Sequence, residues 1–297
     1  MTGTAVVPHR RFLVTLAGAT ALCLAACSER TGPQQPALTA AQADSIGQVV
    51  VADAQADLDV ATAGGGPGFV PGAAPPSVTL SSPYTCNVDD SPPTPANSDA
   101  DRVRDSVRLT FSDCVFTYRV GSDTVHGTID VVDPTPVVTD HALKLSFTDL
   151  ARIHVNRDGL MSSITLNGSR QVIRDSATIS QTIVDFHTDI VFRDGTTASH
   201  IRNWELRFTA DVAGAITPDS WLPSGTLTIT GNSTFTHGDR SFALDVTTPT
   251  PLHFEATCED RPKFDSGTLV AVVTRNGTTT TVTITFTACG QFTVTRT

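Results

Sequence analysis

The feature that most constrains this fold is an alternation of apolar and polar residues with a period of two. It is clearest between positions 143 and 156, where apolar side chains share one parity: Leu143, Leu145, Phe147, Ala151, Ile153 and Val155. Polar side chains such as Lys144, Arg152 and His154 take the other parity. Because successive residues of a β-strand point to opposite faces, this pattern predicts a strand with one buried face and one face in water.

Similar runs fill most of the chain after Val78: 107–120, 124–132, 162–174, 178–193, 198–213, 225–236, 240–247, 267–275 and 279–287. Residues that favour tight turns separate them, as at 157–159 and 193–195. Connections this short favour antiparallel neighbours, and no helices alternate with the strands as a parallel sheet requires. We therefore predict a mainly β fold, a large antiparallel meander shaped as a curved sheet, a barrel or a sandwich.

One hairpin can be predicted down to its register. The dipeptide Asn276-Gly277 favours a two-residue turn, which places Ala271 opposite Val282 and Leu269 opposite Ile284. The apolar faces of the two strands then coincide, whereas a slip of one residue would separate them. We expect this pairing in the folded protein.

One N-terminal helix is predicted over 38–63, where Thr39 can cap and apolar residues recur every four positions: Ile46, Val50, Ala54 and Leu58, with Val49 and Ala56 beside them. A Pro/Gly-rich linker over 64–77 separates it from an antiparallel β domain over 78–297. Because Val270 and Val272 are apolar on the second face of their strand, we expect the helix to cover that face.

The first residues of the chain contain a short apolar run from Phe12 to Ala26 behind the basic pair Arg10-Arg11, which is typical of a signal peptide. It closes on Leu24-Ala25-Ala26-Cys27, which resembles the lipobox of bacterial lipoprotein precursors. The resemblance implies that the signal peptide 1–26 is removed, that Cys27 carries a diacylglycerol and an N-acyl chain such as palmitate, and that 27–37 forms a polar tether. The alternative is ordinary secretion, with cleavage after Ala19-Thr20-Ala21.

The resemblance also implies a place in the cell. Ser28 after the lipidated cysteine is compatible with transport to the outer membrane, so we expect a lipid-anchored protein of the cell envelope. The chain carries 20 basic and 30 acidic residues, and removal of 1–26 takes away two arginines and no acid, so the mature net charge is −12. An acidic protein is repelled by phosphate backbones and anionic headgroups. We therefore predict no nucleic-acid partner and membrane contact through Cys27 alone.

Four cysteines remain after Cys23 leaves with the signal peptide and Cys27 is lipidated, and an even number in an exported chain predicts disulfides with three connectivities. The segment 109–114 resembles 284–289, and each ends in a cysteine with another about thirty residues upstream. This echo favours the pairs Cys86–Cys114 and Cys258–Cys289. A loop of that length contributes about 3.5 kcal/mol on the chain-entropy model.

The densest group of ligand-type residues is Asp185, His187 and Asp189, which share the polar face of one predicted strand after a change of apolar parity near Ile183. Such a change predicts a β-bulge. If the following loop is 194–196, Asn203 falls opposite His187 and Glu205 opposite Asp185. These groups are weak candidates for a divalent cation, and we favour a solvated strand face with no metal and no cofactor.

Asn97, Asp99 and Asp101 alternate like the opening of a calcium loop. The sixth position, which needs a glycine, is Arg102, and the twelfth, which needs a glutamate, is Arg108. We therefore interpret this segment as an ordinary acidic surface loop. The two tryptophans are interpreted as structural: Trp204 lies in phase with a core face, and Trp221 in a turn-rich segment is expected to close one end of the β core.

The chain contains no Gly-x-Ser-x-Gly, His-Glu-x-x-His, Walker loop or Gly-x-Gly-x-x-Gly, the motifs of common hydrolytic, zinc and nucleotide sites. The leading hypothesis is a structural or interaction module displayed from the membrane. The alternative is a carrier for an apolar ligand or lipid in a groove under the helix. A third hypothesis is a metal-assisted enzyme that uses Asp185, His187 and Asp189.

Overall fold

The structure is a computed structural model, and it describes residues 38–62, 85–92, 96–101, 103–118, 121–138, 141–217, 222–238, 240–275 and 277–297. The predicted signal peptide, Cys27, the tether, the linker over 64–77 and Trp221 lie outside these residues.

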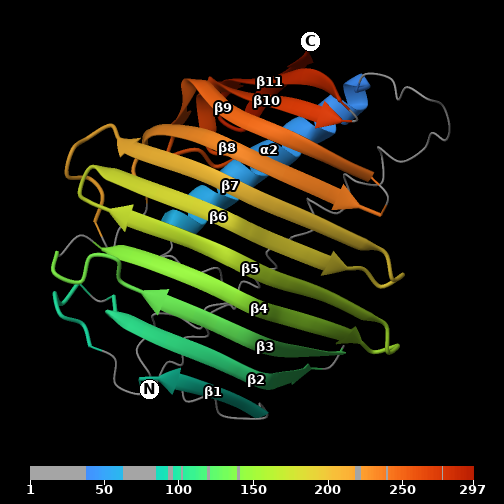
Figure 1. Cartoon of the computed structure of the whole chain (residues 1–297). Helices are drawn as coiled ribbons and strands as arrows, with labels where there is room; N and C mark the ends of the chain where they lie inside the picture. Colours follow the sequence, from blue (N-terminus) through green and yellow to red (C-terminus); the bar gives the residue numbers. More distant parts are fainter. Residues whose placement is uncertain are drawn as a thin grey trace, which may run out of the picture.

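A single sheet of 12 antiparallel strands makes up most of the molecule, and each strand pairs with the next one along the chain (Figure 1). The strands are β1 (Thr85–Ser91), β2 (Ser106–Tyr118), β3 (Gly121–Val132), β4 (Ala142–Asn156), β5 (Met161–Arg174), β6 (Thr178–Val191), β7 (Thr197–Ala210), β8 (Gly225–His237), β9 (Arg240–Phe254), β10 (Phe264–Arg275), β11 (Thr278–Ala288) and β12 (Gln291–Arg296). The sheet does not close on itself, so the curved sheet is the correct one of the three predicted shapes.

Two strands at the sheet edges and part of a third were not predicted. β1 and β12 have only seven and six residues and few apolar side chains, so they offer too little alternation to be recognised from the sequence. β9 continues to Phe254 through Pro249 and Pro251, although the prediction ended at 247. Proline cannot donate to a ladder hydrogen bond. The register between β9 and β10 shifts in this stretch, and these irregularities accommodate the prolines.

The predicted hairpin is confirmed as β10–β11, with Ala271 opposite Val282 and Leu269 opposite Ile284. The prediction of which face the helix covers was wrong. Leu269 and Ala271 are fully buried on the helix side, together with Ile284, whereas Val270 on the opposite face is only half-buried.

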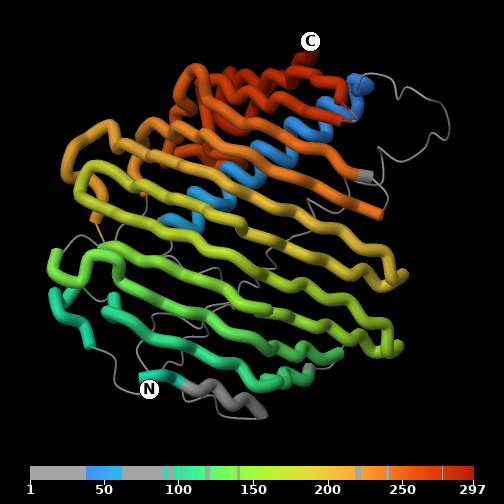
Figure 2. The backbone as a smooth tube through the Cα atoms, viewed as in Figure 1, coloured from blue at the N-terminus to red at the C-terminus, as the bar shows by residue number. Residues whose placement is uncertain are grey.

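The helix α2 (Ala40–Thr62) crosses one face of the sheet obliquely (Figure 2). Thr39 caps it as predicted: its Oγ1 accepts a hydrogen bond from the Gln42 N–H, and the Gln42 side chain accepts one from the Thr39 N–H. Gly47 lies so close to Val294 and Ile284 that a Cβ there would meet both. The missing side chain lets the helix approach β11 and β12 closely.

The four predicted helix positions are all buried: Ile46, Val50, Ala54 and Leu58. The residues predicted to lie beside this buried stripe were wrong, because Val49 is half-buried and Ala56 is exposed. Val51 and Asp57 are buried instead. The helix therefore turns a charged residue toward the sheet.

A row of β-bulges bends the sheet. Asp113 in β2, Asp149 in β4 and Asp185 in β6 each adopt a positive φ, and the strand register shifts at each of them. They lie 36 residues apart, so the bulge repeats with every second strand. Bulges increase local twist and bend the strand. Aligned across neighbouring strands, they fold the sheet toward the helix and enclose one continuous core.

Candidate functional site

A cluster of buried charged groups joins the helix to the sheet. Asp57 on α2 and Arg202 on β7 are 2% and 8% exposed, and the Arg202 guanidinium donates a hydrogen bond from Nη1 to the Asp57 carboxylate, 2.6 Å away. Arg170 on β5 brings its Nη1 to 3.8 Å from the other Asp57 oxygen. Loss of one partner of such a buried pair leaves an uncompensated charge, which costs about 3–5 kcal/mol. This contact therefore fixes α2 over β5 to β7.

A second carboxyl group on the helix has a different environment. One Asp53 oxygen lies 3.7 Å from His200 Nε2 and the other lies 4.0 Å from Arg202 Nη1. Burial raises the pKa of Asp53 to about 7, although Arg202 opposes the shift. Burial and the Arg202 charge lower the pKa of His200 to about 2, so its imidazole is neutral. Asp53 therefore keeps its proton to a much higher pH than an ordinary aspartate.

Aromatic rings pack against Arg170, Arg202 and His200 in this cluster. The guanidinium groups of Arg170 and Arg202 lie 4.5 and 5.4 Å from the ring centroid of Phe186, which places both within cation–π range. The His200 ring stacks on Phe235 at 3.8 Å. Gln181 on β6 is 2% exposed, and neither polar atom of its side chain has a hydrogen-bond partner among the described residues. The layer beneath the helix is therefore polar as well as aromatic.

This cluster was not predicted from the sequence, although a signal was present. Arg202 has the same parity as the core residues Trp204, Leu206 and Phe208, so the alternation already placed an arginine on the buried face. A long cationic side chain in phase with a core face needs a carboxylate partner. Asp57, which supplies it, is 145 positions away in the chain.

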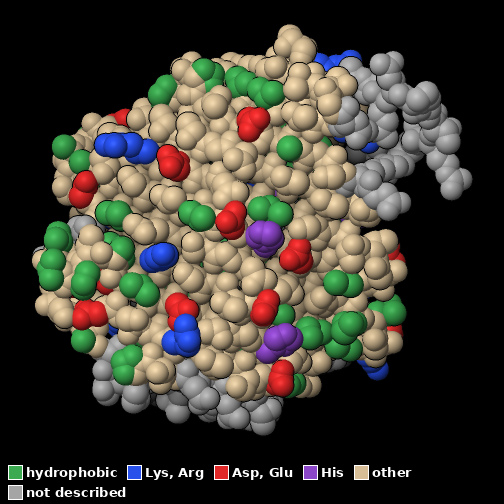
Figure 3. Space-filling view, in the orientation of Figure 1, with side chains coloured by type: hydrophobic (Ala, Val, Ile, Leu, Met, Phe, Trp, Pro, Cys, Tyr) green, Lys and Arg blue, Asp and Glu red, His purple; other side chains and the backbone are tan. Residues whose placement is uncertain are grey.

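The three candidate residues on β6 lie together on the face turned away from the helix, where Asp185 and Asp189 are exposed and His187 is half-buried. Figure 3 shows that face, on which small groups of acidic, basic, histidine and apolar side chains are scattered among other side chains and backbone. The predicted bulge is present, with its register shift between Ile183 and Phe186. The three residues are not among the described groups whose ligand atoms come within 4.8 Å of one another.

Their predicted neighbours were wrong by two residues, since His187 pairs with Ile201 and not with Asn203. The loop is 193–195 instead of 194–196, as the hydrogen bond from Phe192 N–H to the Thr196 carbonyl shows. A three-residue hairpin loop ends on a residue with positive φ, and Gly195 adopts φ 81° there. Asn203 instead accepts a hydrogen bond from the Asp185 N–H at the bulge.

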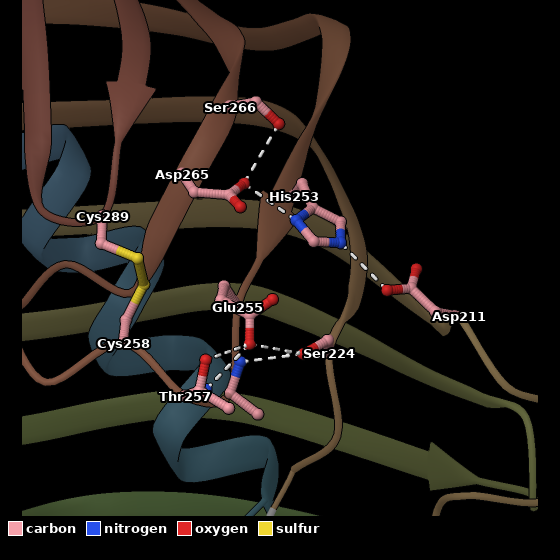
Figure 4. A network of polar contacts seen from close by, with 10 residues as sticks. Asp211, Ser224, His253, Glu255, Thr257, Cys258, Asp265, Ser266 and Cys289 are labelled. Atoms are coloured by element: carbon pink, nitrogen blue, oxygen red, sulfur yellow. Dashed lines mark hydrogen bonds and ion pairs between the residues drawn. A yellow bond between two sulfur atoms is a disulfide. The ribbon is translucent and has the colours of Figure 1, made fainter.

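A second polar network lies beside the ends of β7 to β10 (Figure 4). His253 is held between two carboxylates, with Nδ1 2.8 Å from Asp265 and Nε2 2.9 Å from Asp211. These hydrogen bonds, first that to Asp211, raise the pKa of His253. Nearby, one Glu255 oxygen accepts hydrogen bonds from the Thr257 N–H and hydroxyl.

His253, Glu255 and Asp265 could each offer a metal one ligand atom, and these atoms lie within 4.8 Å of one another. Both imidazole nitrogens of His253 are already engaged by carboxylates. A metal ligand must present a free nitrogen lone pair. We therefore interpret this network as a set of ion pairs that connects strand ends.

The disulfide Cys258–Cys289 is present as predicted and lies beside this network (Figure 4). It joins the loop before β10 to the residue after β11. Cys114 is buried and disulfide-bonded. The register of β1 and β2 places the backbone of Cys86 opposite residues 113 and 114, but its side chain lies outside the described part, so the pair Cys86–Cys114 stays a prediction.

Trp204 belongs to the core as predicted, and its indole N–H donates a hydrogen bond to the buried Ser233 hydroxyl, 2.8 Å away. Most of residues 96–100 are exposed, as predicted for a surface loop, but Asp101 is buried, and both Asp99 and Asp101 meet a third aspartate, Asp133. Among the described residues, no helix is long and apolar enough to cross a membrane.

No protein-family description, curated protein or solved structure matches this chain.

Proposed function

We propose that the protein is a lipid-anchored component of the cell envelope, and that its β domain serves as a structural or interaction module. The lipobox-like segment ending at Cys27 supports the anchor, and two acyl chains give durable attachment where one does not. The tether over 28–37 would reach about 30 Å from the membrane if extended. The domain would then stand clear of the lipid surface.

One observation carries the choice of a module over a carrier: α2 is fixed on the sheet by the buried Asp57–Arg202 ion pair. A ligand groove beneath the helix would have to admit an apolar molecule into a layer that contains Arg170, Arg202 and Gln181. Displacement of the helix would also expose Asp57 and leave Arg202 buried without its partner. The geometry therefore favours a permanent core contact.

The opposite face of the sheet is the surface left for a partner. One row of paired positions crosses seven strands there, and most of its side chains are threonines: Thr182, Glu205, Thr230, Thr247, Val270, Thr283 and Thr295. The exposed large apolar residues of the described chain lie elsewhere, mainly in connections between strands. A partner on this face would be held by polar contacts.

Site-specific photo-crosslinking in the native host tests this proposal. A photoreactive residue at Thr230 or Thr247 should give a discrete adduct in the membrane fraction, and the adduct should disappear in the Cys27→Ser variant. Gln48, which is exposed on the outward side of α2, is the matched control position. Recovery of about one lipid per purified protein molecule, lost when Asp57 is replaced, would contradict the proposal and support the carrier.

A further inference from the structure

Three aspartates from two separate segments meet at the end of β3. Asp99 and Asp101 belong to the stretch before β2, and Asp133 directly follows β3. One carboxylate oxygen from each lies within 4.8 Å of the others. Hydrogen bonds from Ser98 to the Asp105 carboxylate close the first segment on itself, and the Asp133 N–H donates to the Asp105 carbonyl and so joins the two segments.

Each of these carboxylates has one oxygen engaged and one without a donor. Each engaged Oδ1 atom accepts a hydrogen bond from a backbone N–H group. Asp99 Oδ1 accepts from the Asp101 N–H at 3.1 Å, and Asp101 Oδ1 accepts from the Val103 N–H at 2.6 Å. Asp133 Oδ1 accepts from the Thr135 N–H at 2.8 Å. The three Oδ2 atoms are buried, and no described residue donates a hydrogen bond to them. Asp101 and Asp133 are 6% and 2% exposed, so water has little access to them.

Buried anionic oxygens without donors are costly, and three of them at this spacing also repel one another. The titratable group that faces them from the β3–β4 connection is His141, with Nδ1 3.5 Å from Asp101 Oδ2. A protonated His141 would supply one positive charge against three negative ones. Within the part of the chain that the structure describes, the trio therefore lacks a balancing charge equal to its own.

We propose that Asp99, Asp101 and Asp133 bind a calcium ion. Calcium takes six to eight oxygen ligands at about 2.3–2.6 Å, so two oxygens on one ion lie at most about 5 Å apart, as these do. An all-carboxylate set excludes the nitrogen and sulfur ligands that zinc prefers. Magnesium demands near-ideal octahedral geometry and releases its waters reluctantly, which suits a buried site poorly. The ion would fix the segment before β2 to the end of β3.

This arrangement explains why the residues that follow Asn97 do not match a calcium loop. Such a loop needs a glycine where Arg102 stands and a glutamate where Arg108 stands, since all its ligands come from twelve consecutive residues. Here the third carboxylate comes from Asp133, so neither position has to supply a ligand. Arg108 instead forms a surface ion pair with Asp130.

Isothermal titration of the metal-depleted, full-length protein with calcium chloride tests the site, with thermal unfolding as the second readout. One calcium ion per chain should bind, and the melting temperature should rise with calcium concentration. Asp133→Asn should lower the affinity at least tenfold. It should also raise the melting temperature without calcium, because it removes one of three mutually repelling charges. Asp99→Asn provides a second variant if Asp133→Asn does not fold.

Asp130→Asn is the matched control, because it removes the same charge three residues earlier from the exposed pair with Arg108. Its calcium affinity should equal that of the wild type. The proposal is wrong if calcium at about 10 mM, well above the dissociation constants of extracellular calcium modules, produces neither heat nor a thermal shift. An equal response to magnesium, or an equal loss in Asp130→Asn, would also overturn it. This inference does not rest on the proposed function.

Discussion

Two aspartates one helical turn apart show how strongly a carboxyl group depends on its immediate partners. Asp57 receives a hydrogen bond from Arg202 at 2.6 Å and approaches Arg170 as well. Asp53 faces a neutral imidazole, and Arg202 comes no closer than 4.0 Å to it. Desolvation therefore prevails at Asp53 and raises its pKa to about 7. This group should make the stability of the fold depend on pH.

Asp53→Asn should stabilise the protein at pH 8 and have little effect at pH 4. The folded wild type keeps the Asp53 proton up to about pH 7, whereas the unfolded chain releases it near the ordinary pKa of 3.8. The stability of the wild type therefore decreases as the pH rises from about 4 to about 7. Because the two pKa values differ by about three, this loss of stability is at most about 4 kcal/mol. Urea denaturation of both proteins at several pH values measures the difference in their free energies of unfolding. A difference that stays constant with pH, or an equal one for the exposed Asp44→Asn, would contradict the expectation.

At the scale of strands, the bulges decide how the meander bends. The bulges at Asp149 and Asp185 each bring a carbonyl oxygen against the backbone of the neighbouring strand, where glycine occupies the facing position, at Gly127 and Gly168 respectively. A Cβ at Gly168 would collide with the Asp185 carbonyl, and its φ of 98° is one that other residues rarely adopt. The curvature of the sheet therefore depends on a residue without a side chain.

Gly168→Ala should lower the free energy of unfolding by about 3 kcal/mol, because it combines backbone strain with a steric clash that neither strand can relieve alone. Gly159→Ala is the control: it also has a positive φ, of 77°, but nothing lies within 4 Å of the position that the added methyl group would take. It should cost about 1 kcal/mol from strain. Chemical denaturation of both variants measures the difference, and equal losses would show that the clash is relieved.

How far the sequence predicted each element depended on whether its determinants were local. Periodicity and turn residues located the helix, ten of the strands and the β10–β11 register, because alternation and turn type act over a few residues. The β6–β7 register was wrong because Gly195 closes its loop one residue earlier than assumed. The aspartate trio and the Asp57–Arg202 pair were missed because their members are brought together only by the tertiary fold.

At the scale of the whole molecule, the charge of the chain bears on the proposed anchor. The sheet carries scattered charges of both signs on the face away from α2 (Figure 3), and the chain has a formal net charge of −10, which the proposed removal of residues 1–26 would change to −12. An acidic surface is repelled by anionic headgroups at low salt, and screening at higher salt removes the repulsion without creating attraction. The domain itself should therefore have no affinity for a bilayer.

Vesicles that contain phosphatidylglycerol test this expectation together with the proposed anchor. Native protein extracted in detergent and reconstituted should float with the vesicles, whereas Cys27→Ser, made without its acyl chains, should stay in solution at both low and high salt. Each acyl chain contributes about 0.8 kcal/mol per buried methylene, and the acidic domain supplies no electrostatic substitute for it. Flotation of Cys27→Ser at low salt would mean that the folded domain binds lipid directly. Native protein that fails to float and shows no added mass at Cys27 would instead remove the anchor while leaving the fold and the calcium site untouched.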